Sequence, residues 1–318
     1  MRIGITVGIG ERAEESIDGL VARAAEIEGA GLATMWMPVA FGMDPMTALA
    51  VAGRATSRIE CGTAIVPAFP RHPVAMAQQA RTTQAALGGR FTLGIGVSHE
   101  VMMSDGLGLP FDRPASRLRE YLSVLMPLLK GEAVAFRGEH YGVDVAISVD
   151  SPPVPVLVAA LGPRMLRVAG ELTTGTMTAW VGARTLASHV VPTITAAADA
   201  AGRRRPRIAA GLPIALTNDP AAARDHVTAR SGRYGSLPAF RAMFDREGVR
   251  GPADVALVGD EAVLDAELDR LEEAGATDFV AQIQLVDPSA GRRTFDYLVA
   301  RTQRAGGSGV IAPTPDRR

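Results

Sequence analysis

The chain has 318 residues, of which 47% are hydrophobic and 21% are charged, and its net charge is −1. This length suits either one barrel-type domain or two smaller domains. The balanced charge excludes the basic surface of a nucleic-acid-binding protein. A single cysteine, Cys61, excludes a disulfide framework within the chain.

The start of the chain and its apolar segments bear on where the protein resides. Residues 2–7 already have the pattern of a strand, and no signal peptide precedes them. No apolar run approaches the length of a membrane span. We therefore expect a cytoplasmic protein with no membrane partner and no nucleic-acid partner, and we expect Cys61 to be buried inside a strand.

Short apolar segments alternate with helical patterns along the chain. The strand candidates are residues 2–7, 34–37, 59–66, 91–96, 154–159, 174–178, 207–216 and 277–283. The helix candidates are residues 16–28, 45–56, 73–87, 114–129, 163–172, 183–201, 221–231 and 261–273. Roughly eight strand–helix units predict an α/β fold, a (β/α)8 TIM barrel. The alternative is a doubly wound open sheet, whose dinucleotide fingerprint is matched only weakly, at residues 8–13.

Two segments interrupt this alternation. Residues 135–141 predict a small hairpin before the fifth strand, and residues 234–251 carry a short helix (239–247) before the last unit. Insertions in a barrel usually shape the active-site rim or a subunit contact. The Gly- and Pro-rich residues 305–318 predict a disordered tail, so we expect a single domain over residues 1–304.

The segment 153–175 predicts a phosphate-binding turn. A short apolar strand ends at Ala160-Leu161-Gly162-Pro163, and a helix follows that includes Arg164. Pro163 suits the first helical position, and Gly162 is expected to occupy a place where a side chain would clash. Because the first N–H groups of a helix have no partner within it, this helix start predicts an anion site at the carboxyl end of a strand.

A polar loop follows the fourth strand. Val97, Ser98 and His99 come directly after the Gly94-Ile95-Gly96 that ends this strand, so in a barrel they line the active-site end. The glycines would let a flat ligand approach the backbone. The imidazole of His99 titrates in a range suited to proton transfer, whereas the alternative is a loop histidine with no role.

Three further residues are candidates for substrate binding. Phe41 and Trp180 lie near predicted strand ends in a chain with only 5% aromatic residues. Arg71 precedes a helix start, where a cation is disfavoured unless an anionic ligand is present. No metal site is expected, because the five histidines lie in separate segments without metal-ligand spacing.

Five segments of the chain together resemble one family. They are residues 59–73, 89–99, 106–121, 156–175 and 251–279. The chain resembles the luciferase-like flavin and deazaflavin oxidoreductases, in particular the branch that depends on coenzyme F420. The resemblance implies a (β/α)8 barrel, usually dimeric, that binds the deazaflavin at the carboxyl ends of the strands. It also implies hydride transfer between the cofactor's C5 and a small organic substrate, at a CH–OH, C=C or C=N group.

The resemblance also implies roles for residues already named. Ala64 and Ile65 align with a non-proline cis peptide that lies behind the cofactor ring in the family. The loop from Ala160 to Arg164 aligns with the seat of the cofactor's phosphate. Val97, Ser98 and His99 align with a loop that contacts the ring. Some relatives have an acidic proton donor there, and this chain has His99 instead, so the same mechanism cannot be assumed.

Three functions are compatible with these observations. The first is an F420-dependent oxidoreductase in which His99 donates a proton to the substrate, and whose expected partners are a small-molecule substrate and a second copy of the chain. The second is an FMN-dependent monooxygenase of the same superfamily. The third is a barrel that binds the cofactor without catalysis, since fold alone does not fix function.

Overall fold

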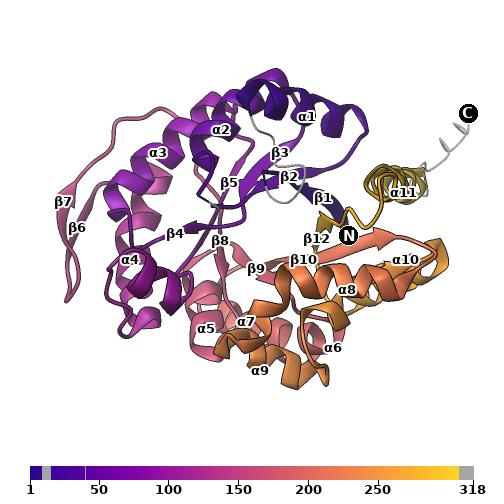
Figure 1. Ribbon diagram of the computed structural model, residues 1–318. Coiled ribbons are helices and arrows are strands. Elements are labelled where there is room, and N and C mark those ends of the chain that lie inside the picture. Colours follow the sequence, from indigo (N-terminus) through magenta and orange to yellow (C-terminus); the bar gives the residue numbers. More distant parts are fainter. Residues whose placement is uncertain (9–15, 40, 308–318) are drawn as a thin grey trace, which may run out of the picture.

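The computed structural model describes residues 1–8, 16–39 and 41–307. Eight parallel strands form a closed barrel, and helices surround it (Figure 1). The barrel strands are β1 (Arg2–Thr6), β2 (Thr34–Met37), β3 (Glu60–Thr63), β5 (Phe91–Gly96), β8 (Val156–Ala159), β9 (Gly175–Ala179), β10 (Arg207–Leu216) and β12 (Asp278–Ile283). The barrel closes because β12 pairs with β1 and β10, and β10 also pairs with β9. The predicted (β/α)8 barrel is confirmed.

The outer helices, apart from the last one, follow the predicted ranges closely. They are α1 (Ile17–Gly29), α2 (Pro45–Ala52), α3 (Pro73–Ala86), α4 (Pro114–Lys130), α5 (Pro163–Leu172), α6 (Ala183–Thr185), α7 (Val191–Ala200), α8 (Pro220–Ser231), α10 (Glu261–Glu273) and α11 (Ala290–Gly307). The prolines predicted at the starts of α2, α3, α4 and α5 all occupy a first-turn position. A π-helical turn, η4 (Leu186–Val190), joins α6 to α7.

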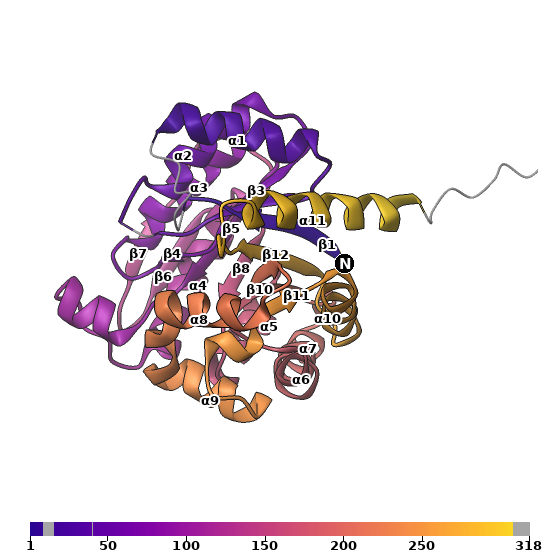
Figure 2. The same cartoon turned by 45° about the vertical axis from the view of Figure 1, so that its right-hand side comes forward.

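Two elements were not predicted. Helix α11 packs against β1, β10 and β12 and then runs out beyond the barrel (Figure 2). Strand β11 (Leu257–Gly259) has only three residues and pairs with the carboxyl-terminal end of β10. Residues 305–307 of the predicted disordered tail belong to α11, which ends at Gly307. Residues 308–318 lie outside the described residues. Residues 9–13 of the weak dinucleotide fingerprint also lie outside them.

Both predicted insertions are present. The first is an antiparallel hairpin of β6 (Val134–Arg137) and β7 (Gly142–Val145), which lies along the outer edge beside α3 and α4 (Figure 1). The second contains the 3-10 turn η5 (Gly232–Ser236) and helix α9 (Pro238–Glu247), which contacts α6. No helix within the described residues is long and apolar enough to cross a bilayer.

The inward-facing side chains form layers along the barrel axis, because alternate residues of a strand face the interior. At the amino end of the strands, Arg207 binds the carboxylates of Asp278 and Glu60. Above this network lies an apolar layer that contains Trp36, Leu157, Met177, Ala209 and Val280. These two layers fill the lower barrel, so we expect a ligand to enter from the carboxyl ends of the strands.

Candidate functional site

The inward-facing residues at the carboxyl ends of the strands, which we call the mouth, are small and incompletely covered. Ala159 and Ala179 keep partial exposure, as do Ala64 and Ile65. At Gly96 a Cβ would lie 2.9 Å from the Cβ of Ala159 and 3.1 Å from Cδ1 of Ile65, so a side chain there would clash with both. The mouth therefore has an apolar floor in which β5 packs closely against its neighbours.

Strand β3 ends at Thr63, directly before the two residues for which the resemblance implied a cis peptide. The peptide bond between Ala64 and Ile65 is cis, which confirms that prediction. The Thr63 hydroxyl donates to the Gly94 carbonyl oxygen at 2.7 Å, and its oxygen accepts from the Gly94 N–H at 2.9 Å. The pair Val66–Pro67 then continues beside β5 as β4. These bonds fix Ala64 and Ile65 against the strand that leads to His99.

Three predicted site residues have left-handed backbones at strand ends. Phe41 follows β2 with φ of 58°, Ser98 follows β5 with φ of 63°, and Trp180 follows β9 with φ of 61°. A side chain costs energy in this conformation, and such positions concentrate at functional sites. Their occurrence around the mouth supports the location of the site.

His99 is half-buried in a cluster of aromatic rings. Its ring centroid lies 6.1 Å from that of Tyr234 and 5.4 Å from that of Phe240. Tyr234 in turn stacks on Trp180, with centroids 5.5 Å apart. Burial, and secondly the charge of Arg233, lower the pKa of His99 below its usual value. The lowered pKa favours the neutral form of the imidazole, which has one ring nitrogen free to accept a proton.

The loop before α5 has the form predicted for it, with one correction. Gly162 is the N-cap, and no side chain caps the first turn of the helix. However, a Cβ at Gly162 would have no protein atom within 4 Å, so the predicted clash is wrong. The space beside Gly162 is instead open, as a site for an external anion requires.

Sequence reasoning missed a residue that braces this loop. His189, in the π-helical turn η4, is buried and lies with Nε2 2.8 Å from the carbonyl oxygen of Leu161. A carbonyl oxygen only accepts, so Nε2 carries the proton and donates it. No spacing motif marks His189 in the sequence, because the residues that it joins come from different units of the barrel.

The structure gives the three predicted substrate residues different surroundings. Phe41 is 72% exposed on the loop after β2. Trp180 is buried, and Tyr234 covers its face. Arg71 pairs with the Asp44 carboxylate and donates to Oε1 of Gln79 at 3.0 Å, so its guanidinium already has partners within the protein.

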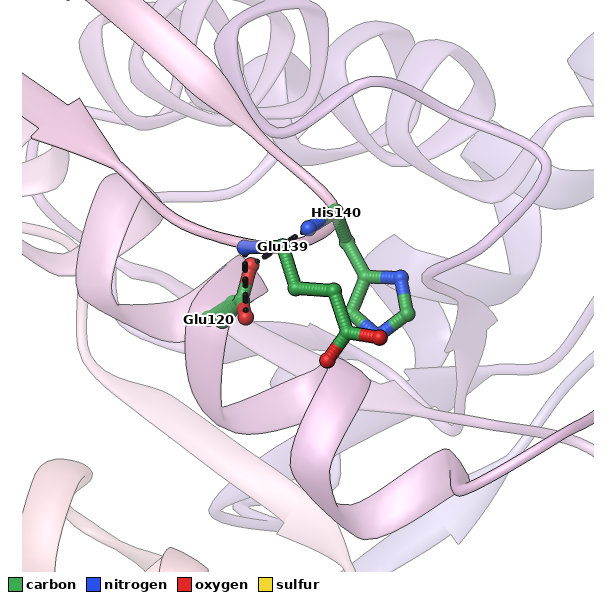
Figure 3. Close-up of side chains that lie close together, drawn as sticks. All are labelled: Glu120, Glu139 and His140. Carbon is green, nitrogen blue, oxygen red and sulfur yellow. Dashed lines mark hydrogen bonds between the residues drawn. The ribbon is translucent and has the colours of Figure 1, made fainter.

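One group of potential metal ligands lies away from the mouth. Glu120 on α4 lies near Glu139 and His140 in the hairpin turn, with the ligand atoms within 4.8 Å of one another (Figure 3). The Glu120 carboxylate accepts from the backbone N–H groups of both hairpin residues, at 3.0 and 2.8 Å. The Glu139 carboxylate is paired with Arg113. These contacts hold the hairpin against α4, which explains why the three side chains lie close together.

Comparison with known sequences points to one family. The profile of the luciferase-like monooxygenase family matches residues 1–295. A Mycobacterium tuberculosis protein, provisionally named a coenzyme F420-dependent oxidoreductase, is 29% identical over 94% of this chain and 90% of its own. An F420-dependent glucose-6-phosphate dehydrogenase from Intrasporangium calvum is 32% identical over 68% of this chain and 66% of its own.

Solved structures of the same fold include both F420-dependent and FMN-containing proteins. The F420-dependent tetrahydromethanopterin reductase from Methanopyrus kandleri matches with a TM-score of 0.76 and 20% identity, over 94% of this chain and 97% of its own. The FMN complex of the 3,6-diketocamphane monooxygenase oxygenating constituent from Pseudomonas putida matches with a TM-score of 0.75 and 18% identity, over 94% and 96%. At these identities the likeness shows the fold alone. The family profile spans most of the chain, and the chain therefore belongs to the luciferase-like monooxygenase family.

Proposed function

We propose that this protein is an F420-dependent oxidoreductase that interconverts a small alcohol and the corresponding carbonyl compound. One observation carries the proposal: His99, whose pKa is lowered by burial, lies half-buried in the loop after β5, at the end of the barrel where Ala64, Ile65, Ala159 and Ala179 keep partial exposure. The choice of cofactor in this proposal rests on the relatives, two of which are named as F420-dependent.

The residues at the mouth fit a flat cofactor with a phosphate-bearing tail. Ala64, Ile65 and Gly96 present backbone and small apolar groups on which a planar ring would lie. The open space at Gly162 and the uncapped first turn of α5 would receive the phosphate, with Arg164 exposed in the same turn. Val97 and Ser98 would contact the ring from the loop after β5. When bound, F420 would supply a hydride acceptor or donor at C5.

His99 would handle the proton in this reaction. An alcohol that loses a hydride from its carbon also loses a proton from its oxygen, and the neutral imidazole would accept that proton at a ring nitrogen. In the reverse reaction the same imidazole, once protonated, would return the proton to the substrate oxygen. We therefore place His99 as the proton acceptor in alcohol oxidation, and the donor role expected from the sequence is the same step in reverse.

An assay for alcohol oxidation tests this function. Purified protein is mixed with F420 and either propan-2-ol or glucose 6-phosphate, and reduction of the deazaflavin is followed by the loss of its visible absorbance. Reduction that depends on His99 is the expected result. Oxygen uptake with reduced FMN, and no reduction of F420 by any of a wider panel of alcohols, would identify the protein as a monooxygenase of the same fold.

We also propose that the chain forms a homodimer through α2 and α3. Between these helices lies a shallow surface groove, which Ala50, Val51 and Ala75 help to line. Val51 is 45% exposed there, and a second copy of the chain seated on the groove would cover it together with Ala50 and Ala75. Sedimentation should give a dimer for the native chain and a monomer for Val51→Glu. A monomeric native chain at micromolar concentration would contradict this assignment.

A further inference from the structure

The insertion after β10 reaches His99 through two rings of its own. Tyr234 of η5 lies nearly edge-on to the imidazole, at 64° between the ring planes, and Phe240 of α9 is tilted against it at 54°. Tyr234 and Phe240 also contact each other, with centroids 5.4 Å apart. The side of His99 that faces the insertion is therefore covered by side chains that are far from it in the sequence.

The insertion is anchored at its other end. The Glu247 carboxylate, at the end of α9, accepts from the backbone N–H of Thr185 at 2.7 Å and from that of Arg184 at 3.2 Å. Phe240 stacks on Phe244, which is fully buried. These contacts hold α9 against α6. Because η5 directly precedes α9 in the chain, they also help to fix the position of η5.

Tyr234 has a second support at the mouth itself. Its ring is stacked on Trp180 with 28° between the planes, and Trp180 belongs to the end of β9. The same ring also contacts His99, with the two centroids 6.1 Å apart. Tyr234 of the insertion thus contacts both Trp180, which follows β9, and His99 in the loop after β5.

The charged and titratable groups around His99 come from few elements. Arg233 and Tyr234 face it from η5, and the Arg233 guanidinium carbon lies 5.3 Å from the Tyr234 ring centroid. Phe240, from α9, is neutral, and Glu100 is the next residue in the chain. Among these groups within the described part of the chain, the charge that acts on the imidazole is that of Arg233.

We propose that Tyr234 is a positioning residue for His99: its ring, fixed on Trp180, holds the imidazole in place and keeps it out of water. The inference rests on the proposed role of His99 as a base. It extends that role by assigning part of the active site to the insertion. If the rings only filled a gap between η5 and the barrel, replacing Tyr234 would change the stability of the fold and leave the protonation of His99 as it is.

Histidine resonances of the ligand-free full chain, followed by NMR over a pH titration, distinguish these outcomes. His99→Gln identifies the His99 signal by its loss. We expect Tyr234→Ala and Tyr234→Leu to raise the pKa of His99 toward its usual value, because both open the imidazole to water. Tyr234→Phe keeps the ring and should leave the pKa unchanged. An unchanged pKa in both Tyr234→Ala and Tyr234→Leu overturns the proposal.

A second pair of variants tests the charge and keeps all of the rings. Arg233 and Arg246 are both exposed cations of the insertion, and Arg233 is the one that acts on His99. Arg233→Gln should raise the pKa of His99, whereas Arg246→Gln should not. Equal effects of the two variants would mean that the insertion acts through its overall charge, which would contradict a specific approach of η5 to His99.

The same samples separate this inference from the proposed function. Titration of the native protein with F420, followed by the fluorescence of the deazaflavin, tests the proposed function independently of the NMR measurement. If the native protein fails to bind F420, the proposed function fails, while the NMR result still decides whether Tyr234 positions His99.

Discussion

Arg207 and Asp278 face each other inside the lower end of the barrel, where the guanidinium donates from Nε to Oδ2 at 2.9 Å and from Nη2 to Oδ1 at 2.7 Å. Arg207 also donates to Glu60 at 2.6 Å, and its guanidinium carbon lies 5.4 Å from the Trp36 ring centroid. The network joins β3, β10 and β12 from inside. It closes the barrel at the end opposite the mouth.

Replacing Arg207 should therefore be costly. Arg207→Met leaves two mostly buried carboxylates without their main partner, a change that typically costs about 3–5 kcal/mol. Urea unfolding at pH 7 measures this loss. Arg270→Gln is the matched control, because Arg270 forms an exposed i,i+3 pair with Glu267 and its loss should cost under about 0.5 kcal/mol. Equal costs for the two variants would contradict the role assigned to the network.

The same network predicts a pH dependence. Burial alone would raise the pKa values of Glu60 and Asp278, but the nearby arginines, chiefly Arg207, outweigh it and lower both. The native network thus contributes stability that is present above the unfolded carboxyl pKa of about 4 and is lost as the pH falls below it. Arg207→Met removes most of this contribution, so the cost of the substitution should shrink as the pH falls from about 5 toward 3. A cost that is constant over this range would oppose this explanation.

Gly162 offers a test of the cofactor site that leaves the fold intact. Its φ of −77° suits any residue and its surroundings are open, so Gly162→Ala should change stability by less than about 1 kcal/mol. An added methyl group would nevertheless meet a bound phosphate, and we expect F420 to bind about tenfold more weakly, or about 1.4 kcal/mol. Gly170→Ala is the contrasting variant: its Cβ would lie 2.5 Å from the Ile194 carbonyl oxygen, so it should destabilise the fold. Native F420 affinity in Gly162→Ala would place the phosphate elsewhere.

His99 should control activity through its protonation. For alcohol oxidation we expect kcat/KM to stay constant from pH 8 down to about 6.5 and to fall only at lower pH, because the pKa of His99 is lowered. His99→Gln should reduce kcat/KM by about 10²–10⁴-fold, the usual contribution of a general base, and should still bind F420. A pH profile that is the same in His99→Gln as in the native enzyme would remove His99 from the mechanism.

Much of the fold could be predicted because each barrel unit carries its own local signals. The strands at residues 34–37, 91–96 and 207–216 were predicted to the residue, since each is an apolar run with clear ends. Helix α11 was missed because its first turns contain Arg292 and Arg293, whose charges obscure the apolar pattern. Strand β11 is too short to show a period and depends on pairing with β10.

The site was predictable where it lies at strand ends and unpredictable where it depends on contacts across the barrel. Ala64, Ile65 and His99 follow strands, so their place at the mouth follows from the fold. Tyr234 and His189 lie in other units, and only the closed barrel brings them to the mouth. The lowered pKa of His99 could not be predicted either, because its largest cause is burial, and Phe240 and Tyr234 cover the ring from other parts of the chain.

The central claim is that this barrel binds F420 and uses it for hydride transfer. Parallel fluorescence titrations of the purified protein with F420 and with FMN test it most directly. The account predicts that F420 binds with a Kd of about 1 µM or lower, or about −8 kcal/mol, and that FMN binds at least tenfold more weakly. Tight binding of FMN without measurable binding of F420 would contradict it.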